Sequence, residues 1–125
     1  MGYLEPVALE AGQGLIRQGE RHQQMYFLDA GEITIEYRTG EDQRVRLESS
    51  GPGTLVGELG LYLGTPASAN VTVAQPGTAY SLSAEDLRRL EREDPLAAAL
   101  LHRFLLKRVG QRLRSSLETM EALSP

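Results

Sequence analysis

The chain has 125 residues, 41 % of them hydrophobic and 24 % charged, which is typical of one globular domain with a single hydrophobic core. This composition excludes a disordered or collagen-like chain. The longest apolar run, residues 96–101, is far shorter than the roughly 20 residues that span a bilayer. The net charge of −4 is unevenly divided, because residues 1–94 contain 15 acidic and 8 basic residues and residues 95–125 contain 2 acidic and 5 basic ones. The sequence lacks cysteine and therefore has no disulfide and no cysteine-bound metal.

Residues 3–83 contain short, β-rich apolar runs separated by glycine, proline and charged residues, which is typical of antiparallel strands in a sandwich or barrel. The predicted strand cores are residues 15–16, 25–28, 33–37, 45–47, 71–73 and 79–82. A hairpin loop is predicted at residues 39–42. Residues 29–31, Asp-Ala-Gly, are expected to separate two strands, since glycine adopts positive φ easily.

The pattern becomes helical after Ser83. Ser83 and Asp86 fit the acidic variant of a capping box, because a hydroxyl and a carboxylate can satisfy the free N–H groups at a helix start. The sequence therefore predicts a short helix that ends near Glu93.

A longer helix is predicted from Asp94-Pro95 to about Ala122, since aspartate is a good N-cap and proline fits the first helical position. Apolar residues recur on it at spacings of three and four: Leu106, Val109, Leu113, Leu117 and Met120. At 1.5 Å per residue such a helix is about 40 Å long, too long to be buried entirely on a small β domain. Part of this stripe is therefore expected to contact a second copy or another protein.

The long helix also has a run of basic residues: Arg103, Lys107, Arg108, Arg112 and Arg114. Such a run can face nucleic acid or anionic lipid. A solvated helix face is the simpler interpretation and the one we favour.

Residues 57–62, Gly-Glu-Leu-Gly-Leu-Tyr, are too short for a core helix, which predicts a single helical turn within a loop. A helix start after glycine exposes free N–H groups and the positive end of the helix dipole, which favours an anion. Ser68 and the N–H of Ala69 are expected to complete this cradle. Because a carboxylate repels an anion, Glu58 is expected at such a site only if it binds a different group, such as a sugar hydroxyl. Alternatively, Glu58 caps the short helix or pairs with an arginine.

These residues resemble the cyclic nucleotide-binding domain family, the module of catabolite-activator-type regulators and of protein-kinase regulatory subunits. Gly57-Glu58-Leu59-Gly60-Leu61 and Pro66-Ala67-Ser68-Ala69 follow the family's phosphate-binding cassette in order and spacing. Residues 14–20, 25–28, 31–33 and 51–53 also match the family pattern. The resemblance implies a mainly β fold with C-terminal helices, namely an antiparallel β-roll or jelly roll (double-stranded β-helix).

The resemblance implies cyclic AMP or cyclic GMP as ligand, with Glu58 bonded to the ribose 2′-hydroxyl and backbone contacts from residues 57–60 and 68–69. Ala67, however, stands where the family has its phosphate-pairing arginine. Loss of that charge-assisted bond weakens binding by roughly tenfold to a hundredfold. A weak nucleotide site, a site for another ligand and an empty pocket all remain open. Arg44 and Arg46 are candidate substitutes, although solvent-facing positions are the simpler expectation.

By the same resemblance, residues 1–83 form the β-roll, with the cassette loop at 57–69, and residues 84–125 form a helical lid and long helix of the same domain. Leu101, Phe104 and Leu105 on the long helix are candidates for covering the base. Ligand binding would reposition this helix, and an element with two positions whose balance a ligand shifts is the minimum requirement for a switch.

The resemblance also implies a cytoplasmic module belonging to a larger protein. The stretch Leu-Gly-Thr-Pro-Ala-Ser-Ala at residues 63–69 looks like the C-terminal domains of some bacterial sulfate permease-type transporters. The alternative function is a ligand-free interaction module that forms a homodimer, or docks on a partner chain, through the 95–122 helix.

Other classes of function have little support in the sequence. His22 and His102 are isolated, so no metal-binding spacing exists, and no cofactor is expected. No catalytic residues are assigned, because no nucleophile triad or paired carboxylates can be identified. The chain ends at Pro125 without a helix-turn-helix segment, so direct DNA binding is not expected.

Overall fold

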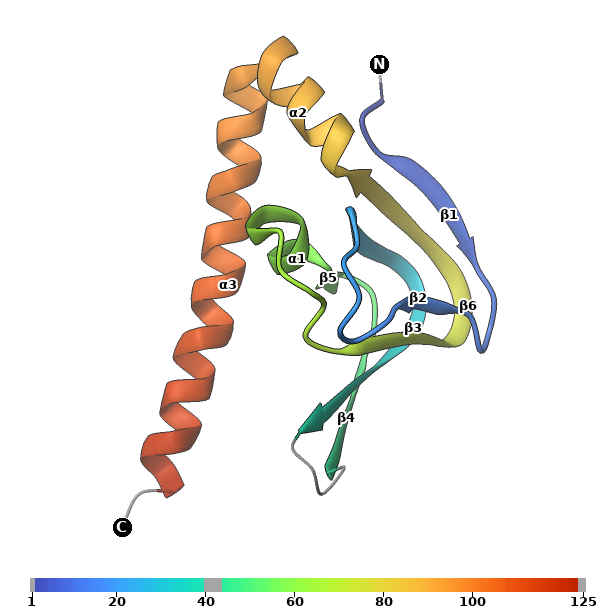
Figure 1. Cartoon of the computed structure of the whole chain (residues 1–125), viewed down its shortest axis with the longest axis vertical. Coiled ribbons are helices and arrows are strands. Elements are labelled where there is room, and N and C mark those ends of the chain that lie inside the picture. The colour runs from blue at the N-terminus through green and yellow to red at the C-terminus, as the bar shows by residue number, and fades with distance from the viewer. Residues whose placement is uncertain (1, 40–43, 124–125) are drawn as a thin grey trace. The chain divides into compact units, whose positions relative to one another are not determined.

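The computed structural model describes residues 2–39 and 44–123 (Figure 1). The elements are β1 (Glu5–Leu9), β2 (Gly14–Ile16), β3 (Gln24–Thr39), β4 (Arg44–Ser50), β5 (Leu55–Val56), α1 (Glu58–Leu63), β6 (Asn70–Ser83), α2 (Ala84–Glu93) and α3 (Pro95–Leu123). They fall into two compact units that divide within α2, after Leu87, and each unit is described by itself.

The first unit is an antiparallel β-structure. Its strands follow the order β1-β6-β3-β4, while β2 also pairs with β6 and β5 also pairs with β3. Every one of these pairs is antiparallel. The predicted fold class, antiparallel β-structure followed by C-terminal helices, is confirmed.

The two longest strands, β3 and β6, pair along most of their length, and β6 is visibly curved in Figure 1. The register shifts several times between residues 28 and 33, where Gly31 has a φ of 99°. A Cβ at Gly31 would lie 2.7 Å from a backbone oxygen of β6, and a Cβ at Gly77 would overlap the backbone of Ala30. The expectation that residues 29–31 separate two strands is wrong, because a glycine-dependent bulge lets one strand continue through this point.

The predicted strand cores omit two elements. In β1 only Leu9 is buried, and β5 has just two residues, so neither gives an alternating pattern. The predicted hairpin loop at 39–42 falls almost entirely outside the described residues. On either side of it, β3 and β4 pair as far as Thr39 and Arg44.

The core of the first unit is one cluster of buried apolar side chains from β1, β2, β3, β5, β6 and the segment before β6. On β6, Val71 and Val73 are buried and Thr72 is exposed, as the pleat of a strand requires. Ala67 and Ala69 continue this alternation ahead of the strand and belong to the same cluster. The end of the cassette loop is therefore part of the core.

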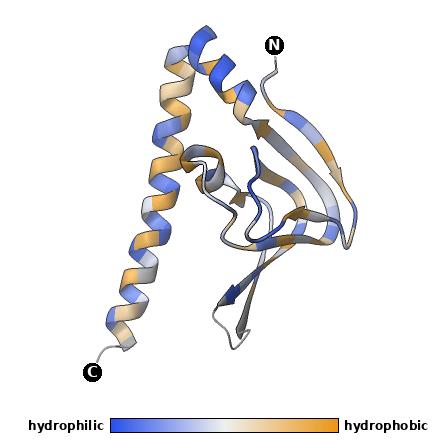
Figure 2. Cartoon of the chain, viewed as in Figure 1, coloured by the Kyte–Doolittle hydropathy of each residue, from blue (hydrophilic) through white to orange (hydrophobic). Residues whose placement is uncertain are grey.

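The predicted helix starts and ends are confirmed. The amide of Asp86 donates to Ser83 Oγ at 3.0 Å, and the amide of Ala97 donates to Asp94 Oδ1 at 3.1 Å, so the side chains of Ser83 and Asp94 both cap their helices. In the second unit, His102 Nε2 lies 3.2 Å from Glu91 Oε2 and links α3 to α2. Figure 2 shows hydrophobic and hydrophilic residues interspersed along α3. No helix within the described residues has the length and apolarity that a membrane span needs.

Candidate functional site

The first end of the cassette is a single helical turn, as predicted. Gly57 (φ 87°) precedes α1 and Gly64 (φ 69°) follows it, and both adopt the left-handed conformation that glycine allows most easily. The amide of Leu61 donates to the Gly57 carbonyl at 3.1 Å, and the amide of Gly64 donates to the Gly60 carbonyl at 2.9 Å. Two glycines therefore set the length of this helix.

Glu58, the first residue of α1, is only 4 % exposed, and Ser81 is the other buried polar or charged residue among those described. A buried carboxylate costs free energy unless it interacts with another group, and Glu58 does so within the protein. Leu59, the next residue, is exposed, whereas Gly60 is buried. The predicted residues of this end thus form a short helix with one buried acid.

The second end of the cassette, residues 67–69, lacks a cation. Ala67 is 8 % exposed and Ala69 is 7 % exposed, and both methyl groups lie in the apolar cluster. Ser68, between them, is exposed. Ala67, which stands where the family resemblance places an arginine, therefore points a methyl group into the interior.

The loop between β2 and β3 binds the cassette through its backbone and one arginine. The amide of Gly19 donates to the Ala67 carbonyl, and the amide of Ala67 donates to the Glu20 carbonyl, both at 2.9 Å. Arg21 Nη1 donates to the Gly64 carbonyl at 2.7 Å, next to the C-terminus of α1. These contacts were not predicted, because bonds between segments far apart in the chain produce no local sequence pattern.

His22, in the same loop, contacts the first end of the cassette. Its Nδ1 lies 2.9 Å from the Gln24 carbonyl oxygen, and its ring lies against Gly57 and Gly60. In the sequence, His22 is only an isolated histidine. No signal in the sequence alone pairs it with α1.

The remaining predicted residues lie elsewhere. Leu101, Phe104 and Leu105 are on α3, in the second unit; Leu105 is buried, and the guanidinium of Arg108 lies 5.7 Å from the centre of the Phe104 ring. The side chains of Arg44 and Arg46, candidate substitutes for the missing arginine, lie outside the described part of the structure.

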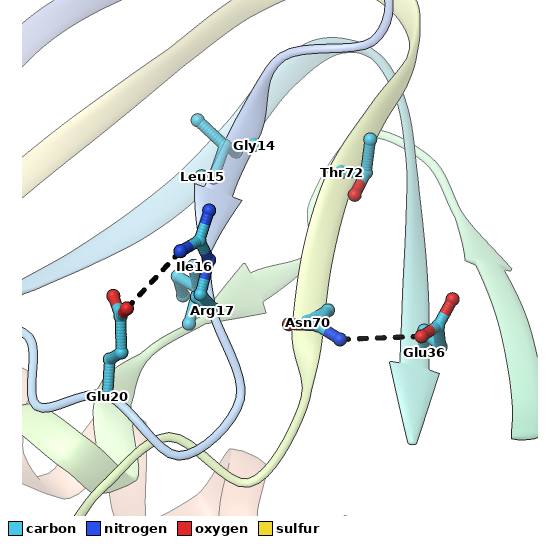
Figure 3. A pocket seen from close by; sticks show the side chains of 8 residues that line it. All are labelled: Gly14, Leu15, Ile16, Arg17, Glu20, Glu36, Asn70 and Thr72. Carbon is cyan, nitrogen blue, oxygen red and sulfur yellow. Dashed lines mark hydrogen bonds and ion pairs between the residues drawn. The ribbon is translucent and has the colours of Figure 1, made fainter. Parts of the chain in front are cut away.

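A separate groove of about 510 Å³ is formed by residues of β2, β3, β6 and the loop that follows β2 (Figure 3). Its lining residues are Gly14, Leu15, Ile16, Arg17, Glu20, Glu36, Asn70 and Thr72. Asn70 Nδ2 donates to Glu36 Oε1 at 3.4 Å, and Arg17 lies 3.4 Å from Glu20. None of the cassette residues 57–69 lines this groove, so the two features are distinct.

Glu36 is the titratable residue of this groove with a shifted pKa. Arg38 Nε donates to its carboxylate at 2.7 Å, and this hydrogen bond lowers the pKa of Glu36 below the usual value of 4.5. Charge attraction to Arg38 and the bond from Asn70 act in the same direction. Among the described residues, those of the groove included, no group of three or more acidic or histidine side chains is placed to hold a metal ion.

Comparison with known proteins identifies the family. The family model described as cyclic nucleotide-binding domain matches residues 6–94, which include the whole cassette. The chain therefore belongs to the cyclic nucleotide-binding domain family, whose members are generally regulatory ligand-binding domains. It is 34 % identical over 107 residues to a cyclic nucleotide-gated potassium channel of Rhizobium etli, an alignment that covers 86 % of this chain and 28 % of the channel.

Solved structures agree with this assignment. A cyclic nucleotide-binding domain from Methylobacillus flagellatus superposes with a TM-score of 0.89 over 98 % of this chain and 69 % of that one, at 20 % identity, which shows the common fold. The catabolite activator protein of Thermus thermophilus gives a TM-score of 0.76 at 26 % identity and covers 95 % of this chain and 55 % of its own. The fold is therefore the β-roll of this family. The chain spans less than a third of the length of the first curated relatives that it matches.

Proposed function

We propose that the chain is a regulatory module that binds a cyclic nucleotide weakly, through a cassette that keeps its shape but lacks its phosphate-pairing cation. The observation that supports this most directly is the buried Ala67 methyl group at the position where the family resemblance places arginine. Without the guanidinium, affinity falls by roughly tenfold to a hundredfold relative to a complete cassette. The family membership and the buried carboxylate of Glu58 support retention of the remaining contacts.

In this proposal Glu58 accepts a hydrogen bond from the ribose 2′-hydroxyl, and the backbone of Gly57, Leu59 and Gly60 contacts the cyclic phosphate. Ser68 and Ala69 contribute from the second end of the cassette, and Leu101, Phe104 and Leu105 cover the base. Cyclic AMP and cyclic GMP are the candidate ligands.

We further propose that residues 1–83 and 84–125 act as β-roll and helical lid of one sensor domain within a longer, cytoplasmic or cytoplasm-facing protein. The Rhizobium channel, of which the alignment covers 28 %, is one relative of much greater length and supports a longer protein. The sequence of residues 63–69 favours a sulfate permease-type transporter as the longer protein that contains this domain. Within this proposal the module is a regulatory ligand-binding domain, and we assign it no catalytic step, cofactor or direct DNA contact.

Thermal unfolding with and without ligand tests the proposal. A ligand that binds only the folded state, present at ten times its Kd, adds about 1.4 kcal/mol to the stability. For a chain of this size that raises the unfolding midpoint by about 4 °C. We expect such a rise with millimolar cyclic AMP or cyclic GMP and none with linear AMP, the matched control. The absence of any rise with both cyclic nucleotides would contradict the proposal.

A second candidate function rests on a separate observation, the exposed apolar residues of α3. Leu106, Leu113, Leu117 and Met120 are each more than half exposed, and they recur at the spacing of one helical face. A second copy of the chain would cover this stripe. In sedimentation velocity we expect a concentration-dependent dimer that Leu113→Glu abolishes and Gln111→Glu, which adds the same charge away from the stripe, preserves. A monomer at every concentration would exclude this self-pairing.

A further inference from the structure

The imidazole ring of His22 is held in a defined place beside α1. A carbonyl oxygen can only accept, so His22 Nδ1 donates its hydrogen to the Gln24 carbonyl, 2.9 Å away. This bond orients the other ring edge toward α1. A Cβ added at Gly57 would lie 3.0 Å from His22 Cε1. A Cβ added at Gly60 would lie 2.9 Å from the same atom and would overlap Nε2.

The ring of His22 explains why position 60 is a glycine, whereas the backbone conformation at this position does not require one. Gly57 has a φ of 87°, which favours glycine whatever surrounds it, but Gly60 is helical and has no positive φ. Inside a helix glycine is less favourable than alanine, so a helical glycine calls for a reason in the packing. Here the reason is volume, because the imidazole fills the space that a methyl group at position 60 would need.

The contacts of His22 belong to a longer set along the same loop. Gln18 N donates to Asn70 Oδ1 at 2.7 Å, Gly19 and Glu20 bond to Ala67, and Arg21 bonds to Gly64. Residues 19–22 thus contact the cassette from its second end back to its first, and Gln18 contacts the residue that follows it. His22 is the member of this set that contacts the start of α1, at Gly57 and Gly60.

We propose that His22 is a positioning residue of the cassette: its ring, anchored on Gln24, sets the place of the first turn of α1 and with it the backbone amides of this turn and the carboxylate of Glu58. The part of this inference that concerns ligand affinity rests on the proposed function. The part that concerns the place of α1 stands without any ligand.

A double-mutant cycle tests the packing. Gly60→Ala alone is expected to lower the thermal unfolding midpoint by about 5 °C or more, because the new methyl group collides with a tethered ring. In the His22→Ala background the same change is expected to be neutral or stabilising, since alanine is the better helix former. Gly51→Ala, a glycine with open space around its Cβ and no positive φ, is the matched control and leaves the midpoint nearly unchanged. A Gly60→Ala variant as stable as the parent, or equally destabilised in both backgrounds, overturns the inference.

A second measurement separates positioning from mere packing. His22→Ala is expected to change the residual dipolar couplings of the backbone amides of residues 58–61 in the absence of ligand, because these couplings report N–H bond orientation and do not respond to loss of the ring current. The variant is also expected to bind cyclic AMP at least about threefold more weakly at a temperature where it is fully folded, because misplaced groups make poorer hydrogen bonds. Unchanged dipolar couplings overturn the inference. If the parent chain binds no cyclic nucleotide, the proposed function fails, and the mutant cycle and the dipolar couplings decide the role of His22 by themselves.

Discussion

The two ends of the cassette differ in what holds them in place. At the first end, residues 57–60, the chain needs a glycine at positive φ, keeps one buried carboxylate and accommodates a histidine ring. At the second end, residues 67–69, the backbone is bonded to the β2–β3 loop and the side chains are small. The first end is constrained chiefly by backbone conformation and volume, and the second by backbone hydrogen bonds and by two methyl groups buried in the apolar cluster.

This difference explains how the cassette keeps its shape without an arginine. The amide and carbonyl of Ala67 bond to Glu20 and Gly19, and these bonds do not involve the side chain at position 67. These bonds therefore hold the loop whether or not the side chain at position 67 is an arginine. Ligand affinity, by contrast, depends on the charge that this one side chain brings to the site.

The largest effect is expected at the first end, for Gly57→Ala. This change combines a left-handed conformation for alanine with a Cβ only 2.8 Å from the Gln24 carbonyl oxygen, and we expect a loss of about 3 kcal/mol in the free energy of unfolding. Gly53→Ala is the matched control, because Gly53 has a φ of 92° and open space around its Cβ. It should lose only about 1–2 kcal/mol. Equal losses of unfolding free energy for the two variants, measured in urea, would show that the close contact around Gly57 contributes nothing to the stability.

A smaller effect is expected for Glu58→Gln, which keeps the shape of the side chain and removes its charge. A hydrogen bond to a charged group contributes about 1.5–3 kcal/mol, so nucleotide affinity should fall by roughly tenfold or more. Glu10→Gln, at an exposed position in the same unit, serves as the control and should bind like the parent. Calorimetric titration of both variants provides the comparison. Unaltered affinity for Glu58→Gln would assign Glu58 to the folding of the cassette alone.

The smallest effect is expected outside both ends, at Glu36. The bond from Arg38 lowers the pKa of this carboxylate in the folded state, so its stabilisation is present above the unfolded value near 4.5 and is lost as the pH falls through the folded value. Glu36→Gln should therefore make the unfolding midpoint slightly less sensitive to acid between pH 7 and pH 3. Ligand affinity at pH 7 should not change. A large change in that affinity would connect the groove to the cassette.

Much of the fold was predictable because its signals are local. The change from alternating to helical apolar spacing after Ser83, and the caps at Ser83 and Asp94, depend on neighbours within a few residues. Residues 29–31 were misassigned because a turn and a glycine bulge use the same residue types. The opposing Gly77, on another strand, decides between them.

The cassette motif could be predicted from the sequence, but the residues that contact the cassette could not. Residues 57–69 are contiguous, so their order and spacing can be recognised in the sequence. The contacts of Arg21 and His22 with the cassette join segments that are distant in the chain. Only the fold brings them together, and neither residue type is by itself a signal.

The most direct test of the central claim is calorimetric titration of cyclic AMP into the parent chain and into Ala67→Arg. The account predicts that arginine at this position raises affinity by about tenfold to a hundredfold. It also predicts a lower unfolding midpoint without ligand, because a guanidinium replaces a methyl group in an apolar cluster. Binding that is absent or equally weak in both proteins would contradict the claim that the missing cation alone limits this site.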